Sequence, residues 1–127
     1  MTGQAEEVRR ALRERYDEFE RCCKRRDADN LVRAFYTPDA LMGGTGIPLT
    51  RGREAIKTIA SGLINAVTGV RVEIIEVRVG PDGATAYDIS HIHAVLPDGS
   101  KGMDRACCVW RRTGEGWRVD VDWVIRG

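Results

Sequence analysis

Apolar and polar residues alternate along the second half of the chain, whereas along most of the first half apolar residues recur every three or four positions. Alternation is typical of β-strands, and the wider spacing is typical of helices that bury one face. From residue 84 to 127, three alternating runs are joined by turns at Pro97–Gly99 and Gly114–Gly116. This part predicts a three-stranded antiparallel meander, whose twist would wrap it around helices and leave a pocket.

Two helices are predicted at the start of the chain. The first carries an apolar stripe from Ala5 to Cys23, with acidic residues near its start and basic residues near its end, as the helix dipole favours. Asp27 is placed to cap a second, short helix, which Thr37–Pro38 ends. The charge pattern and the cap agree with the periodicity, so both helices are expected to pack through their apolar stripes.

The middle of the chain predicts a brief strand at 40–42 and a third helix from about Arg53, closed by Gly69. The run 70–79 alternates but changes phase between Ile74 and Ile75, which predicts a β-bulge there. The expected order of elements is therefore α-α-β-α-β-β-β-β.

Length and charge narrow the class of protein. A chain of 127 residues fits one domain over residues 1–127. Twenty basic and 19 acidic residues give a net charge of +1, so no overall field attracts nucleic acid or an acidic membrane. The polar start and the lack of a long apolar run predict a soluble, cytoplasmic protein.

Two local motifs suggest no cofactor or metal. The four cysteines form adjacent pairs, Cys22–Cys23 and Cys107–Cys108, without the gap that suits zinc or a redox disulfide, so reduced thiols are expected. The glycine-rich loop Gly43–Pro48 is not followed by Gly-Lys-Ser/Thr, and Pro48 removes a backbone donor. It is therefore not expected to bind phosphate.

Several segments resemble a known family: Phe35–Ala40, Arg51–Ile56, Val109–Arg112 and Gly116–Val119 are similar to the SnoaL-like branch of the nuclear-transport-factor-2-like superfamily. The resemblance covers nearly the whole chain. It implies an α+β conical barrel, in which one curved, mostly antiparallel sheet wraps around three N-terminal and central helices. It also implies a deep apolar pocket and frequent dimers through the outer sheet face. No single reaction is implied, because the superfamily includes isomerases, dehydratases, polyketide cyclases and non-catalytic modules.

Standard ketosteroid isomerase activity is not expected from this resemblance. Those enzymes use an aspartate base together with a tyrosine and a protonated aspartic acid. The matching positions here hold Gly44, Phe19 and Cys108. Tyr16 lies one helical turn before Phe19, from where its hydroxyl could reach a similar space.

Strand alternation gives a map of the pocket. If Val121 and Trp123 face inward, antiparallel pairing brings Asp88 and its neighbours on alternate positions to the same face. The residues expected to bind substrate are Phe19, Phe35, Met42, Ser90, Ile92, Asp104, Cys108, Trp110, Val121 and Trp123.

Asp88 and Tyr16 are the candidate catalytic residues. A carboxylate among Trp110 and Cys108 would lose water, which raises its pKa towards the neutral range that a general base or acid needs. The alternative is that Asp88 is ionised, either paired with an arginine or near the rim in water. If the strand parity is the reverse, His91 and Asp122 become the better candidates.

The outer face is expected to contact a second subunit, because it is too apolar for open water. His91 and His93 share this face at a spacing compatible with a metal, and a row of histidine, cysteine and aspartate would suggest an activated thiolate. The motif has no third ligand at a local spacing, so no metal is expected. The full set expected on this face is Tyr87, Ile89, His91, His93, Arg105, Cys107, Asp120 and Asp122.

Two functions stay open at this point. One is a cofactor-free acid–base enzyme of the isomerase, dehydratase or polyketide-cyclase type, with Asp88 accepting a proton from a small, apolar or aromatic metabolite and Tyr16 or Ser90 as hydrogen-bond partner. The other is a non-catalytic ligand-binding or dimerisation module, accessory to a biosynthetic pathway. A cavity of about 300 Å³ or more that Asp88 reaches would favour the enzyme. A homodimer is expected, with no nucleic acid or membrane partner.

Overall fold

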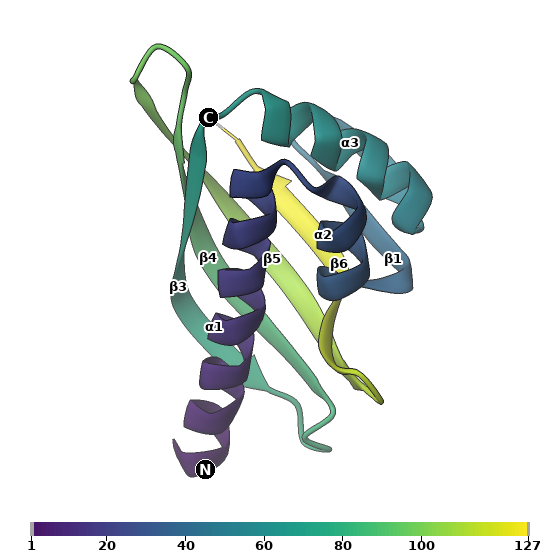
Figure 1. Ribbon diagram of the computed structural model, residues 1–127. Coiled ribbons are helices and arrows are strands. Elements are labelled where there is room, and N and C mark those ends of the chain that lie inside the picture. Colours follow the sequence, from purple (N-terminus) through teal and green to yellow (C-terminus); the bar gives the residue numbers. More distant parts are fainter. Residues whose placement is uncertain (1, 127) are drawn as a thin grey trace.

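The computed structural model describes residues 2–126 and shows a curved six-stranded sheet with three helices on its concave face (Figure 1). The α+β prediction is confirmed. The elements in chain order are α1 (Thr2–Arg25), α2 (Ala28–Phe35), β1 (Tyr36–Gly44), β2 (Ile47–Arg51), α3 (Arg53–Asn65), β3 (Gly69–Val79), β4 (Thr85–Val95), β5 (Lys101–Thr113) and β6 (Gly116–Ile125).

The strands are arranged in the order β2-β1-β6-β5-β4-β3, so the sheet has open edges at β2 and β3. Only β1 and β6 pair in parallel, and the remaining neighbours are antiparallel. The predicted meander is present as β4, β5 and β6. None of the three helices in the described part of the chain combines the length and the apolar character needed to cross a membrane.

Two expectations for the middle of the chain were wrong. The glycine-rich segment at 43–48 is not a loop but the turn of a β-hairpin, in which Thr45 and Gly46 connect β1 to the unpredicted strand β2. Gly46 has a φ of 70°, a conformation that glycine adopts without strain. Gly69 does not close α3, because the helix ends at Asn65 and Gly69 is the first residue of β3.

The long helix α1 lies across the concave face of the sheet, with its C-terminal half beside α2 (Figure 1). Its predicted stripe is buried at Val8, Leu12 and Tyr16. Arg9 donates a hydrogen bond of 2.7 Å to the carbonyl of Ile74, and Arg13 donates to the carbonyl of Val72. These bonds attach the helix to β3, the strand at one edge of the sheet.

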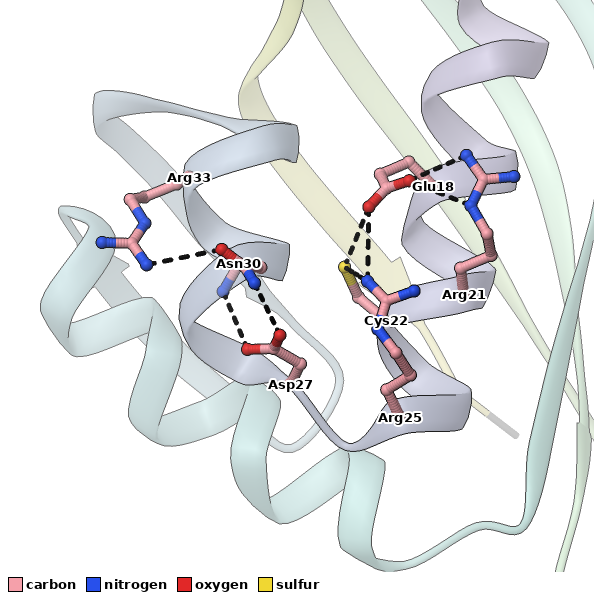
Figure 2. A network of polar contacts seen from close by, with 7 residues as sticks. All are labelled: Glu18, Arg21, Cys22, Arg25, Asp27, Asn30 and Arg33. Atoms are coloured by element: carbon pink, nitrogen blue, oxygen red, sulfur yellow. Dashed lines mark hydrogen bonds and ion pairs between the residues drawn. The ribbon is translucent and has the colours of Figure 1, made fainter.

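Figure 2 shows two sets of polar contacts on either side of the corner between α1 and α2, one along the end of α1 and one at the start of α2. Asp27 caps α2 as predicted, since its carboxylate accepts from the backbone N–H of Asn30 at 3.1 Å. On α1, Glu18 pairs with Arg21 at 2.7 Å and with Arg25 at 3.5 Å. Both arginines are more than half exposed, so each pair contributes little to stability, and the cap is the larger contribution.

Two β-bulges set the directions of the side chains in the part of the sheet formed by β3 to β6. The predicted bulge in β3 is confirmed, because the pairing with β4 skips Ile75. A second bulge, which was not predicted, occurs where β5 pairs with β6. Val109 pairs with Val121 and Trp110 with Val119, so that Asp120 is the extra residue. Beyond this point β6 has the opposite phase from the one that alternation predicts.

Candidate functional site

A cavity of about 330 Å³ lies between the concave face of the sheet and the helices. Apolar side chains from all three helices and from β1, β3, β4, β5 and β6 form most of its wall. It includes residues after the end of α3 and residues of the β4–β5 hairpin, which lie at the same end of the molecule (Figure 1). The ionisable side chains in the wall are Cys23, Tyr36, Asp104, Asp122 and Arg126.

Asp122 is the buried carboxyl group of this wall, with only 7% of its surface exposed. The Tyr36 hydroxyl donates to Oδ2 at 2.6 Å, and the Cys108 thiol donates to Oδ1 at 3.5 Å. Loss of water raises the pKa of Asp122, and the two hydrogen bonds offset only part of that rise. Burial and the neighbouring Asp122 raise the pKa of Tyr36 well above its usual value, so this tyrosine stays a neutral hydrogen-bond donor.

Asp88 faces inward, as predicted, and is fully buried. The Tyr16 hydroxyl lies 2.9 and 3.1 Å from its two oxygens, and the Trp110 indole donates to Oδ1 at 2.7 Å. Burial raises the pKa of Asp88 to about 6, although the bonds from Trp110 and Tyr16 act in the opposite direction. Within residues 2–126 no arginine forms an ion pair with Asp88. Of the two environments considered for Asp88, the structure therefore shows the one without water and without a cationic partner.

The two aspartates stand in one row across the sheet. Asp88 pairs with Cys108 across β4 and β5, and Cys108 pairs with Asp122 across β5 and β6. Burial and both carboxyl groups raise the pKa of the Cys108 thiol well above its usual value, so it remains protonated. The charge of Asp122 adds to the rise in the pKa of Asp88, and the row therefore behaves as one coupled unit.

The predicted substrate-binding residues fall into three groups: those that line the cavity, those in the packed core, and Val121 and Trp123, which face the other side of the sheet. Phe19, Met42, Ile92 and Asp104 line the cavity. Phe35, Ser90, Cys108 and Trp110 face the same side of the sheet or the helix layer but lie in the packed core. Asp88 is likewise absent from the cavity wall, and its catalytic role stays a prediction.

The predicted inward positions of Val121 and Trp123 were wrong. Because of the bulge at Asp120, Trp123 pairs with Cys107 on the convex face of the sheet and is 46% exposed. Its indole lies against the backbone of Gly43, where a Cβ atom would come within 2.5 Å of the ring. Val121 faces the same side, since it pairs with the exposed Val109.

The same bulge explains why Asp122 was expected on the outer face. Val119, Val121 and Trp123 alternate without a break, so hydropathy gives no sign of an extra residue at 120. The one available signal is the run of three apolar residues from 123 to 125, which leaves the phase of the strand end undetermined. Tyr36 was missed as well, although it adjoins the predicted Phe35.

A row of histidine, cysteine and aspartate, which would have suggested an activated thiolate, does not form on the convex face. Cys107 pairs with Ile89 rather than with a histidine, and Asp122 faces the cavity. Partial burial raises the pKa of the Cys107 thiol, so nothing there favours a reactive thiolate.

Comparison with known protein families assigns the chain to a family. The SnoaL-like domain matches residues 12–120 of the chain. The chain belongs to the SnoaL-like domain family. A search among curated proteins gave no match.

Solved structures share the fold at low sequence identity. A nuclear-transport-factor-2-like protein with a cystatin-like fold from Novosphingobium aromaticivorans is 23% identical, with a TM-score of 0.75 over 94% of this chain and 82% of that one. A ketosteroid isomerase-like protein from Erwinia carotovora is 18% identical, with a TM-score of 0.73 over 91% and 93%. A candidate scytalone dehydratase from N. aromaticivorans is 14% identical, with a TM-score of 0.78 over 100% and 89%. At these identities the likeness concerns the fold alone.

Proposed function

We propose that this SnoaL-like protein is a cofactor-free acid–base enzyme that acts on a small, largely apolar molecule, with Asp122 as the proton-transfer group. One observation carries the proposal: a buried carboxyl group with a raised pKa stands in the wall of a largely apolar cavity of about 330 Å³. The volume is within the range of small-molecule sites. A carboxyl group with a raised pKa both accepts and returns a proton efficiently near neutral pH.

Isomerisation, dehydration and cyclisation often share a first step, in which a proton leaves a carbon next to a carbonyl group. The proposed site suits this step, because Asp122 is buried and would accept the proton in largely apolar surroundings. The fold likeness to a ketosteroid isomerase-like protein and a candidate scytalone dehydratase supports this class of reaction.

Further residues have proposed roles around Asp122. Tyr36 fixes one carboxylate oxygen at 2.6 Å and leaves Oδ1 with only the longer contact to Cys108. Asp88 and Tyr16, the pair predicted from the sequence, lie on the far side of Cys108. We propose that they act through that row on the charge state of Asp122 rather than on the substrate directly.

The test is solvent deuterium exchange with 2-tetralone, an apolar ketone with acidic protons next to its carbonyl group. Proton NMR in D₂O would follow the loss of these signals. The wild type should accelerate exchange over buffer, and Asp122→Asn should reduce that acceleration by a factor of about a hundred or more. Asp29→Asn, the same change at an exposed helix position, should not alter it. Equal exchange by Asp122→Asn and the wild type would reject Asp122 as the base.

A second candidate function is a ligand-binding module without catalysis. It is favoured by the fact that both oxygens of Asp122 already have donors within the protein, as expected of a structural carboxyl group. In that case 2-tetralone would bind, seen as shifts in the protein's NMR spectrum, without faster exchange in the wild type.

We also propose that the protein is a homodimer that pairs through the convex face of the sheet. Tyr87, Val109 and Trp123 on β4, β5 and β6 are 47%, 38% and 46% exposed. Tyr87 and Val109 are direct cross-strand neighbours, so the exposed surface is continuous across them, as in surfaces that bind other proteins.

A further inference from the structure

We propose that Glu73, His91 and His93 form a binding site for a divalent transition metal ion, with Zn²⁺ as the best-suited ion, on the convex face of the sheet. The site is separate from the cavity, which lies on the opposite face. It would take the ion through two imidazole nitrogens and one carboxylate oxygen.

The strand pairing brings the three ligands together. His91 and His93 are two residues apart on β4, so both side chains project from one face. Glu73 on β3 is the direct cross-strand partner of His91. This supplies the third ligand that the local sequence lacks, because it comes from a neighbouring strand 18 positions away.

The distances are close to those of a three-ligand site. Oε1 of Glu73 lies 2.9 Å from Nε2 of His93 and 3.9 Å from Nδ1 of His91. All three ligand atoms lie within 4.8 Å of one another. Ligands bound at about 2.0–2.1 Å in a tetrahedral zinc site are about 3.3 Å apart. The side chains of His91, His93 and Glu73 are 29%, 32% and 48% exposed, respectively. Small rotations of these side chains would bring the three ligand atoms to the spacing of a zinc site.

The chemistry of the ligand set favours zinc and its neighbours among the transition metals. Imidazole nitrogen suits zinc, copper and nickel, whereas calcium and magnesium require sites built from oxygen alone. Three protein ligands leave one position of a tetrahedral ion for water or for an anion. Because β3 is an edge strand, an ion can reach the site from solvent.

The surrounding charges set the expected affinity. Arg71 pairs with His93, and Arg105 pairs with His91, both across the convex face. Glu73 is then the single acidic ligand between two cations, which repel a divalent ion. We therefore expect micromolar rather than nanomolar binding of zinc.

Isothermal titration calorimetry with ZnCl₂ tests the proposal on full-length protein without a histidine tag. One ion per chain should bind to the wild type. His91→Ala and Glu73→Gln should each weaken binding at least tenfold without changing the circular dichroism spectrum, because both side chains are partly exposed. Cys107→Ser is the matched control, since Cys107 is a partly exposed thiol on the same face, and it should bind zinc as the wild type does.

NMR gives a second readout, because His91 and His93 are the only two histidines in the chain. Zinc should shift the imidazole nitrogen signals of both residues. The proposal is overturned if the wild type does not bind zinc, if His91→Ala and Glu73→Gln bind with unchanged affinity, or if Cys107→Ser abolishes binding.

Discussion

Two buried carboxyl groups and the thiol between them dominate the chemistry of the concave face. Asp88, Cys108 and Asp122 occupy adjacent strands in one row, and only Asp122 lines the cavity. Each aspartate receives a tyrosine hydroxyl, from Tyr16 and Tyr36 respectively. The row thus holds two pairs of an aspartate with a tyrosine, and a ligand in the cavity can reach only the aspartate of the second pair, Asp122.

The raised pKa of Asp88 predicts a pH dependence of stability. Its pKa is about 6 in the folded protein against 3.8 ordinarily. The folded state therefore holds the proton over a range in which the unfolded chain has lost it. The resulting stabilisation is complete below about pH 4 and is lost as the pH rises through 6. The shift corresponds to about 3 kcal/mol.

Urea denaturation of the wild type and Asp88→Asn across pH 4 to 8 measures this effect. The amide is nearly isosteric, so the variant should fold but lack this dependence on pH. The difference in free energy of unfolding between the two proteins should change by about 3 kcal/mol over that range, in favour of the wild type at the acidic end. Parallel pH profiles would show that Asp88 has an ordinary pKa.

At the scale of elements, the parallel contact between β1 and β6 leaves no room for a side chain at Gly44. Gly44 has a φ of 137°, and a Cβ atom there would lie 1.8 Å from the carbonyl oxygen of Val124. Val124 accepts a hydrogen bond from Thr45 at the same place. No other residue type fits this position without moving one of the two strands.

Gly44→Ala should therefore lower the free energy of unfolding by about 3 kcal/mol or more, from backbone strain and the steric clash together. Gly46→Ala is the control. It also has a positive φ, of 70°, but its Cβ atom would meet nothing within 4 Å, so about 1 kcal/mol is expected. Urea denaturation measures both variants. Similar decreases in the free energy of unfolding for the two would show that the clash with Val124 does not destabilise Gly44→Ala.

Most elements could be predicted from the sequence because their patterns are local. The cap at Asp27 and the bulge at Ile75 each left a local sign in the sequence, and both are present. The bulge at Asp120 left no sign at its own position, because the residues on both sides continue the same alternation, and the apolar run at 123–125 leaves the phase of the strand end open. The orientation of Asp122 depends on how β6 pairs with β5 and β1, and that pairing is a long-range property of the sheet.

At the scale of the whole molecule, all three helices cover one face of the sheet and leave the other open (Figure 1). The open face carries the large exposed side chains for which we propose a dimer. One chain supplies the residues that line the cavity, so the proposed chemistry at Asp122 does not depend on this association.

If the proposed dimer forms, the protein should sediment with the mass of two chains at micromolar concentration. Val109→Glu would place a charge at the centre of the proposed contact and should shift the protein to the monomer. Thr58→Glu adds the same charge at an exposed position on α3 and should leave the dimer intact. A wild-type monomer in analytical ultracentrifugation would contradict the proposal.

The most direct test of the proposed function is an NMR titration of the aspartate carboxyl carbons, with and without 2-naphthol as an apolar probe that carries one hydroxyl group. Asp122→Asn identifies the Asp122 signal by its loss. We expect Asp122 to titrate clearly above the ordinary value of about 3.9, because burial disfavours its charge. We also expect 2-naphthol to shift its signal while leaving that of the exposed Asp29 unchanged. An ordinary pKa for Asp122 together with no response to 2-naphthol would contradict the account.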